Sequence, residues 1–276
     1  MYSLKQEIFK LAKKNNAKIA IGLLEASNSI KDSLKRASSF ADITIIGKKI
    51  KGFKYIPANK DNIEEKEVKL ILSKKIDGLI RGQADTYKFE DLLSKKAGYS
   101  REQVLVSGLF EDQFKRMFFT TSGSHSDGWT IKSKILMVDE LIKKMNGLKI
   151  KPKIAFLTWV RPGSVGRNFF LDQSWEQAEY LVKYYNKKGY KVKNYNIEIE
   201  TALNDGANLI CFATGASGNM FSRTLAFLVK NPFYIYFHTG IRENIIENNR
   251  TVQDYFNMVL GASAFAKPSK QKYEKK

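Results

Sequence analysis

A run of apolar residues leads into a glycine-bearing turn at positions 209–219, where the sequence is Leu209-Ile210-Cys211-Phe212-Ala213-Thr214-Gly215-Ala216-Ser217-Gly218-Asn219. Five consecutive apolar residues are typical of a short strand that is buried on both faces of a sheet. Small and polar residues after such a strand are typical of the turn into a helix, which we predict from Met220 onward. The segment therefore predicts one strand–turn–helix step of a parallel sheet covered by helices.

The same alternation extends outward in both directions along the chain. Further strands are predicted at residues 19–23, 43–46, 76–80, 104–106, 117–121, 154–158, 192–197 and 233–237. Apolar residues at helical spacing separate most of these strands, and the last helix is predicted to open at Thr251 and to end at Gly261. The pattern as a whole predicts an α/β protein with a largely parallel sheet.

The pattern changes between residues 110 and 130, where a strand of another type at 117–121 is followed by a turn-rich segment at 122–128. We therefore predict that the chain crosses between two domains in this region. The first α/β domain is expected to comprise residues 1–115 and 238–266, and the second residues 116–237. A basic disordered tail is expected at residues 267–276, where positive charge gathers beyond the folded part.

The composition excludes several classes of protein. Hydrophobic residues make up 43% of the 276 residues, and no run approaches the ~18–20 apolar residues that a spanning helix needs. The first seven residues carry no secretory signal pattern, and the single cysteine, Cys211, cannot form an intramolecular disulfide. We therefore expect a cytoplasmic protein with no membrane contact. The formal net charge of +19 is scattered along the chain, which favours compositional bias and small anionic ligands over nucleic acid as a partner.

Four polar loops follow predicted strands, where open α/β sheets bind their ligands. The first offers Gly82 for a tight turn, with Asp85 or Thr86 to cap the next helix, although an ordinary capped turn accounts for the same residues. The second follows the strand at 154–158 and combines glycines, a hydroxyl and two guanidinium groups, which suit phosphate or carboxylate. Its candidate binding residues are Arg161, Gly163, Ser164, Gly166 and Arg167.

The third and fourth loops also carry candidate anion-binding residues. In the third, small residues expose backbone amides at a helix N-terminus, and Arg223 lies one turn into that helix. In the fourth, Arg250 stands just before the predicted last helix, where the helix dipole repels cations. This placement favours a ligand for Arg250, and a solvent-exposed arginine is the alternative. The remaining candidates of the third loop are Thr214, Ser217, Gly218 and Asn219.

In this order, the loops resemble those of the phosphate acetyl/butyryl-transferase superfamily. The segment from Ser217 to Arg223 is similar to that superfamily's Ser-Gly-Asn-Ile-x-Tyr-Lys element, with arginine in place of lysine. The pairs Gly240-Ile241 and Asn249-Arg250 match a Gly-Leu…Ser-Arg stretch at equal spacing, and Gly82 with Asp85-Thr86 matches a Gly…Ala-Asp-Thr loop. The stretches at 158–164 and 214–219 more closely resemble an archaeal, methanogen-restricted branch, the methanogenesis marker family named after a methyltransferase-associated X subunit (MtxX).

The resemblance implies two α/β domains of the isopropylmalate-dehydrogenase-like or phosphate acetyltransferase-like type that flank a cleft, and a homodimer. It also implies a transferase that acts on phosphate or a coenzyme A thioester. In such a site, Arg250 would hold phosphate and Asp254 would act as acid/base or orient the groups. Asn249 replaces the family's serine, and Arg223 replaces its lysine, so a changed substrate is expected.

Two alternatives to acyl transfer stay open. The same cleft could serve methyl transfer with tetrahydromethanopterin or a corrinoid as cofactor and methyltransferase proteins as partners. The chain could also be a non-catalytic binding or assembly protein for methanogenesis enzymes.

Among other constellations, His125 and Asp127 lack a third metal ligand of convincing spacing, and His238 is either a packed residue or a cleft residue. Trp159 is a further candidate to line a ligand.

Overall fold

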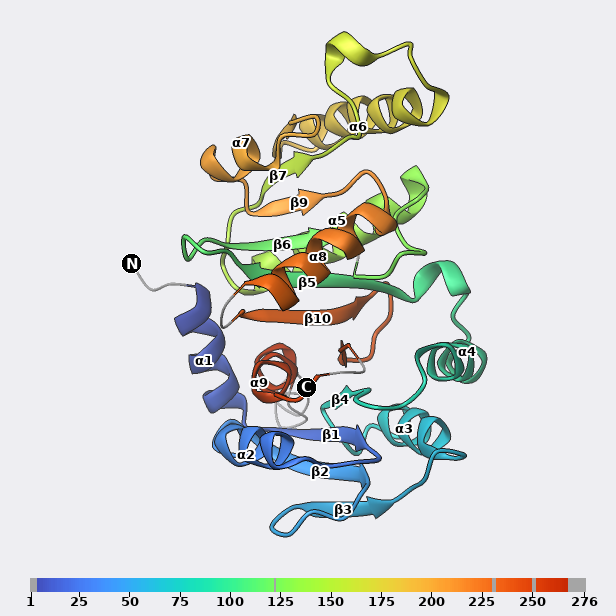
Figure 1. The fold of residues 1–276 in the computed structure, drawn as a ribbon, viewed down its shortest axis with the longest axis vertical. Helices are drawn as coiled ribbons and strands as arrows, with labels where there is room; N and C mark the ends of the chain where they lie inside the picture. Colours follow the sequence, from blue (N-terminus) through green and yellow to red (C-terminus); the bar gives the residue numbers. More distant parts are fainter. Residues whose placement is uncertain (1–3, 122, 230–231, 250–251, 268–276) are drawn as a thin grey trace, which may run out of the picture. The chain divides into compact units, whose positions relative to one another are not determined.

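The computed structural model describes residues 4–121, 123–229, 232–249 and 252–267, and it confirms the α/β class (Figure 1). The chain forms two compact units. Unit 1 comprises Met1–Val104 and Ile235–Lys276, and unit 2 comprises Leu105–Tyr234. The domain boundaries predicted from the sequence remain predictions, and the predicted tail from residue 268 onward lies outside the described residues.

Unit 1 is built on a mostly parallel sheet with the strand order β3-β2-β1-β4-β11-β10. Neighbouring strands run parallel, except that β10 and β11 are antiparallel. The strands β3 and β11 are short and were not predicted from the sequence. The bounds are β1 Ala17–Leu23, β2 Ala41–Gly47, β3 Lys54–Pro57, β4 Gly78–Ile80, β10 Tyr234–Thr239 and β11 Ile245–Glu247.

Helices pack on the sheet of unit 1 in two groups. Helix α9 packs on β1, β4 and β11 and against α1 and α2, whereas α3 packs on β1, β2 and β4 and against α4. The core beneath α3 and α4 contains Ile63, Val68, Phe89 and Leu93, all of which are buried. The bounds are α1 Leu4–Asn15, α2 Asn28–Ala37, α3 Ile63–Leu72, α4 Thr86–Ala97, α9 Phe256–Phe265 and the 3-10 helix η1 Arg101–Gln103.

The prediction for the last helix is wrong at both ends. Helix α9 begins at Phe256, so Val252 and Tyr255 precede it, and it continues through Gly261 to Phe265. Gly261 does not end the helix but permits close packing, because a Cβ atom there would lie 2.5 Å from Cγ2 of Ile235 in β10. The argument that Arg250 is a cation placed at a helix start therefore loses its basis.

Unit 2 contains a sheet with the order β5-β6-β9-β7-β8, in which only β5 and β6 pair antiparallel among the described strand pairs of this unit. Helix α5 packs on β5, β6 and β9, α6 on β7 and β8, and α8 on β6. The strands are β5 Leu105–Glu111, β6 Met117–Thr121, β7 Lys153–Phe156, β8 Lys191–Asn194 and β9 Leu209–Cys211, and the helices are α5 Ile131–Gly147, η2 Pro162–Ser164, α6 Phe169–Lys187, α7 Ile199–Asn204 and α8 Gly215–Leu228.

Side-chain caps fix where the helices of unit 2 begin. Thr130 caps α5 and Asn168 caps α6, each by accepting a hydrogen bond from an amide in the first turn. Helix α8 begins at Gly215 instead of the predicted Met220, because the Thr214 side chain accepts from the Ser217 amide and so starts the helix earlier. Within the described part of the chain, no helix is long and apolar enough to cross a membrane.

Candidate functional site

Unit 1 holds a group of charged side chains that are removed from solvent, which we call the buried charge cluster. They come from α3, the residue after β4, α4, the end of β10 and β11, so four elements and one loop of the fold converge on it. Chemical groups of this kind are costly to bury unless they are paired or bind a cation. The members of the buried charge cluster are Glu64, Glu67, Arg81, Glu90, His238 and Glu247.

Arg81 is the centre of the hydrogen bonding in this cluster. It directly follows β4 and is 1% exposed. Its Nε donates to Oε1 of Glu247 at 2.6 Å, and its Nη2 donates to the carbonyl of Asn248 at 2.7 Å and pairs with Glu247. Its Nη1 donates to the carbonyl of Ala84. All three guanidinium nitrogens are therefore engaged, and Arg81 ties the end of β4 to the end of β11.

Glu247 stays ionised in this setting. Burial alone would raise the pKa of its carboxyl, but the Arg81 guanidinium and the hydrogen bond with His238 lower that pKa to about 2. Because Oε1 is held by Arg81, the other oxygen, Oε2, faces Nε2 of His238 at 3.3 Å. The Glu247 carboxylate thus joins a fixed cation to an imidazole, and its orientation is set in advance.

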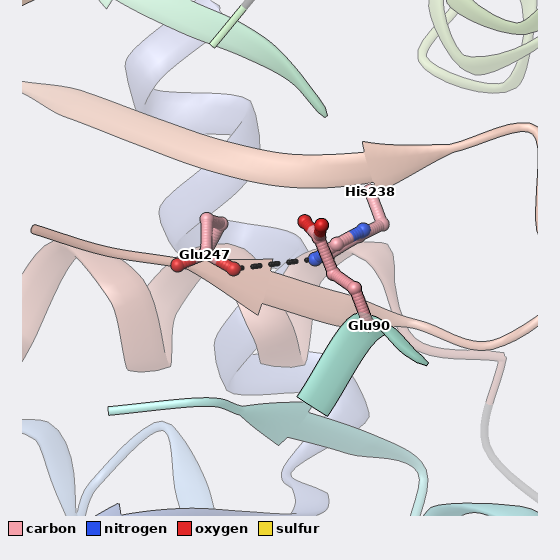
Figure 2. Close-up of side chains that lie close together, drawn as sticks. All are labelled: Glu90, His238 and Glu247. Carbon is pink, nitrogen blue, oxygen red and sulfur yellow. Dashed lines mark hydrogen bonds and ion pairs between the residues drawn. The ribbon is translucent and has the colours of Figure 1, made fainter. Parts of the chain in front are cut away.

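Glu90, His238 and Glu247 form the part of the cluster with metal-ligand chemistry. Their side chains point toward one another in Figure 2, and one ligand atom from each lies within 4.8 Å of those of the other two. The His238 side chain is fully buried, and its Nδ1 has no hydrogen-bond partner among the described residues. The prediction left His238 open between packing and a site, and the structure places it in a charged cluster.

Glu67 is the most unusual member of the cluster. It is 0% exposed on α3, and within the described residues neither of its carboxyl oxygens has a hydrogen-bond partner. Burial raises the pKa of the Glu67 carboxyl well above its usual range; Arg81 lowers it in part, and Glu64 and Glu247 add to the rise. A Cβ atom on Gly22 in β1 would overlap Oε1 of Glu67, so a glycine is required opposite this carboxyl.

The first predicted loop has structural partners in unit 1. Gly82 adopts a φ of +64°, and its amide donates to Oδ1 of Asn248 at 2.8 Å. A Cβ atom on Gly82 would overlap the carbonyl of Gly22, which explains the glycine. Asp85 accepts hydrogen bonds from two amides of the first turn of α4, and Thr86 is the first residue of that helix. These contacts match the ordinary capped turn that the sequence left open.

The second and third predicted segments come together within unit 2. Strands β7 and β9 are parallel neighbours, and Phe156 pairs with Cys211 at their carboxyl ends. The chain therefore leaves both strands at the same edge of the sheet, toward the segments 158–168 and 212–219. This edge carries the predicted residues Arg161, Gly163, Ser164, Gly166, Arg167, Thr214, Ser217, Gly218 and Asn219.

The two segments differ in how far they are exposed. Arg161 pairs with Glu198 at 3.1 Å at the surface, and Gly163, Gly166 and Arg167 are exposed. In α8, by contrast, the amides predicted to hold an anion already have protein partners. The Gly215 amide donates to the carbonyl of Asp127 at 2.6 Å, and the Gly218 amide donates to that of Thr214 at 3.1 Å.

Other side chains of α8 are also engaged. The Asn219 side chain donates from Nδ2 to the carbonyl of Gly123 at 2.6 Å and so ties α8 to the segment that follows β6. Arg223 is exposed, and its guanidinium carbon lies 5.4 Å from the centroid of the Phe227 ring. This distance falls within the ~6 Å of a cation–π contact. The predicted role of Arg223 in anion binding remains a prediction.

Of the predicted catalytic residues, Arg250 lies outside the described residues, and the other two belong to unit 1. The carbonyl of Asn249 accepts hydrogen bonds from the Asn248 side chain and from the Val252 amide, each at 3.0 Å. Asp254 is 56% exposed, pairs with Arg36 at 2.5 Å, and accepts from the Phe256 amide at 2.8 Å at the start of α9. Its observed contacts are thus an ion pair and a hydrogen bond from the first amide of α9.

Sequence reasoning missed most of the buried charge cluster. One signal was present in α3, where Glu67 stands four residues after Ile63 and four before Ile71 and so falls on the apolar face of the helix. A carboxyl group in an apolar stripe indicates a buried charge that needs a partner. Glu90 and Glu247 gave no comparable signal, because their neighbours in the cluster are distant in the sequence.

Comparisons with known proteins agree with the resemblance drawn from the sequence. No protein-family model matches the chain. A Methanosarcina mazei protein named "Putative methyltransferase mtx subunit X" is 28% identical over 235 residues, which cover 83% of this chain and 82% of that protein. A Methanosarcina barkeri protein of the same name is 28% identical over 79% of this chain and 81% of its own length.

Solved structures with this fold include phosphotransacylases and dehydrogenases. A branched-chain phosphotransacylase from Enterococcus faecalis matches with a TM-score of 0.69 at 14% identity, over 90% of this chain and 99% of that one. A phosphotransacetylase from Streptococcus pyogenes matches with 0.64 at 14% identity, over 95% and 98%. A 4-hydroxythreonine-4-phosphate dehydrogenase from Burkholderia phymatum matches with 0.54 at 11% identity, over 91% and 98%. The chain therefore has the phosphotransacetylase-like α/β fold.

Proposed function

We propose that this relative of the mtx subunit X proteins is a transferase that acts on an anionic substrate, namely phosphate together with an acyl thioester. The observation that carries the proposal is the common edge of unit 2, where the segments after the parallel strands β7 and β9 leave the sheet side by side. Ligands of α/β sheets bind at such edges. The names of the relatives and of the phosphotransacylase with this fold support a transferase.

The residues at this edge suit an anion. The guanidinium groups of Arg161 and Arg167 can each bind a phosphate with two parallel hydrogen bonds, and Ser164 adds a hydroxyl. In the proposed reaction, a phosphate oxygen forms a bond to the thioester carbonyl carbon, the carbon–sulfur bond breaks, and the thiolate leaves and takes up a proton. Fixed positive charge stabilises the negative charge that develops on the oxygens during this transfer.

The experiment measures release of free coenzyme A from acetyl- and butyryl-coenzyme A in the presence of phosphate, with a thiol reagent as readout. The protein does not interfere, because its single cysteine, Cys211, is buried. The double variant Arg161→Ala/Arg167→Ala should lose at least tenfold in kcat/KM, since each charged hydrogen bond contributes about 1.5–3 kcal/mol. The control is Arg101→Ala, which removes an equally exposed arginine of an ion pair in unit 1. Absence of phosphate-dependent release with both substrates would refute acyl transfer.

Asp254 and its neighbours Asn249 and Arg250 enter this proposal as catalytic residues, and Asp254 offers the cleaner test. The variant Asp254→Asn keeps a side-chain oxygen that can accept the hydrogen bond from the Phe256 amide. It loses the negative charge that would take a proton. A strong loss of turnover with an unchanged melting temperature would support the acid/base role. Unchanged turnover would leave Asp254 with only its hydrogen bond from the Phe256 amide and its ion pair with Arg36.

A second candidate function is methyl transfer, and the names of the relatives favour it. In that case the ligand would be an anionic pterin or corrinoid cofactor. Tetrahydromethanopterin and a corrinoid should then raise the melting temperature of the protein, while acetyl-coenzyme A and phosphate should not. The reverse pattern supports the acyl transfer proposed above.

A further inference from the structure

We propose that Glu90, His238 and Glu247 bind one divalent transition-metal ion in unit 1. The site goes beyond the proposed transfer reaction and does not depend on it, because none of its three residues belongs to the edge of unit 2. It rests on the convergence of three ligand side chains from α4, β10 and β11 that point toward one another in Figure 2. No other cluster of three or more such groups lies this close among the described residues.

The distances are close to those of an occupied site. The three ligand atoms lie within 4.8 Å of one another. Zinc binds nitrogen and carboxylate oxygen at about 2.0–2.2 Å, so two of its ligands in a tetrahedral site stand about 3.4 Å apart. Side-chain shifts of about 1 Å would therefore bring all three atoms to bonding distance. Two of the ligands are held by strands and one by a helix, which makes the arrangement rigid.

A second observation points to a ligand, and it concerns the histidine itself. The His238 side chain is fully buried, and its Nδ1 has no hydrogen-bond partner among the described residues. A buried polar atom without a partner is costly and rare in native proteins. An ion bound to the imidazole would fix the position of its proton, because one ring nitrogen then bonds the metal and the other carries the hydrogen and can donate it to a water.

The charges of the surrounding cluster also favour a cation. Apart from Glu67, whose burial disfavours its charged form, it holds three carboxyl groups, on Glu64, Glu90 and Glu247, and a single guanidinium, on Arg81. One positive charge does not balance this number of acidic groups in a buried place, and a divalent ion would offset the excess. Figure 2 shows the three ligand side chains reaching toward one another from different elements of the fold.

Arg81 acts on the proposed site as a positioning residue. It binds Oε1 of Glu247 through Nε at 2.6 Å, which leaves Oε2 turned toward His238. Ligating carboxylates are commonly oriented by a hydrogen bond of this kind from outside the metal's own ligands. Glu90 is only partly buried, so this ligand side chain keeps contact with solvent.

The donor set selects the class of ion. An imidazole nitrogen with two carboxylate oxygens suits Zn²⁺, Mn²⁺ or Fe²⁺, whereas Mg²⁺ and Ca²⁺ prefer oxygen alone. Three protein ligands leave at least one coordination position open, as in catalytic zinc sites and unlike closed structural sites with four protein ligands. The site is therefore expected to hold water or a small oxygen ligand beside the ion.

The experiment strips the full-length protein with dipicolinic acid and titrates it with Zn²⁺ and Mn²⁺ by calorimetry. Wild type should bind one equivalent, and Glu90→Gln and His238→Gln should each bind at least tenfold more weakly. The control is His125→Gln, which removes the other histidine of the chain from an exposed position in unit 2 and should bind as wild type does. Glu90→Gln keeps the test decisive if His238→Gln does not fold, because Glu90 is only partly buried.

Three outcomes would overturn the proposal. The stripped wild type might take up neither Zn²⁺ nor Mn²⁺ at micromolar concentration, or Glu90→Gln and His238→Gln might bind as tightly as wild type. Loss of binding in His125→Gln with retention in the other two variants would move the site to unit 2. Because the readout is metal binding, failure here leaves coenzyme A release untouched, and failure of that assay leaves this one standing.

Discussion

The ion pair between Arg81 and Glu247 offers a sharp test of how unit 1 is stabilised. Arg81 is 1% exposed and Glu247 is 12% exposed, and the guanidinium also donates to the carbonyls of Ala84 and Asn248. The variant Arg81→Met fills a similar volume but leaves these acceptors and the Glu247 carboxylate without their donor. Removing one partner of a buried pair costs about 3–5 kcal/mol, because the other charge stays buried without compensation.

The matched control is Arg161→Met. Arg161 pairs with Glu198 in a similar way, but the two side chains are 64% and 36% exposed. Exposed pairs contribute about 0–1 kcal/mol, since water solvates the remaining partner. The difference between the two losses in unfolding free energy therefore separates the effect of burial from the loss of an arginine as such.

Urea unfolding followed by far-ultraviolet circular dichroism measures both effects. Tryptophan fluorescence is a poor probe here, because Trp129, Trp159 and Trp175 all lie in unit 2 and would not report on Arg81. If Arg81→Met does not fold, Arg81→Lys keeps the charge, loses the forked hydrogen bonds and should give a smaller, measurable loss. A cost below ~1 kcal/mol for Arg81→Met, comparable to the control, would refute the reasoning from burial.

Three further predictions concern single side chains. Gly261→Ala should destabilise unit 1 by about 1–3 kcal/mol, because the new methyl group would lie 2.5 Å from Ile235. Its control is Gly147→Ala at the open end of α5, which should be neutral or stabilising. Equal melting temperatures for the two variants would contradict this prediction. The pKa of the Glu67 carboxyl is raised in the folded state, so above the unfolded pKa of about 4.5 the folded protein binds more protons than the unfolded chain. The stability that this group contributes is therefore lost as the pH rises above about 4.5. By urea midpoints, Glu67→Gln should therefore be more stable than wild type at pH 7.5 in EDTA and nearly as stable as wild type at pH 4. A difference between the two midpoints that grows toward low pH would contradict the raised pKa of Glu67. Burial raises the pKa of the Cys211 thiol to about 11, so iodoacetamide at pH 8 should label the protein only after unfolding, as mass spectrometry would detect.

The alternation of apolar runs and helical spacing determined most of the secondary structure. The strands around residues 19–23, 43–46 and 209–211 lie where the sequence predicts them, because burial of an apolar face is a local property of each segment. The resemblance in the loops also led to the superfamily whose fold the chain has. The roles predicted for the loop residues, and for Arg250 above all, remain predictions.

The tertiary structure alone decided the limits of α9 and the composition of the buried charge cluster. Gly261 is a typical helix end in the sequence, yet the approach of Ile235 makes glycine the residue that fits inside this helix. Arg81 and Glu247 are separated by 166 positions and meet because β11, a strand too short to predict, inserts between β4 and β10. Local patterns report how each segment divides between solvent and core, but they carry no record of which strands become neighbours, and that order is what brings these charges together.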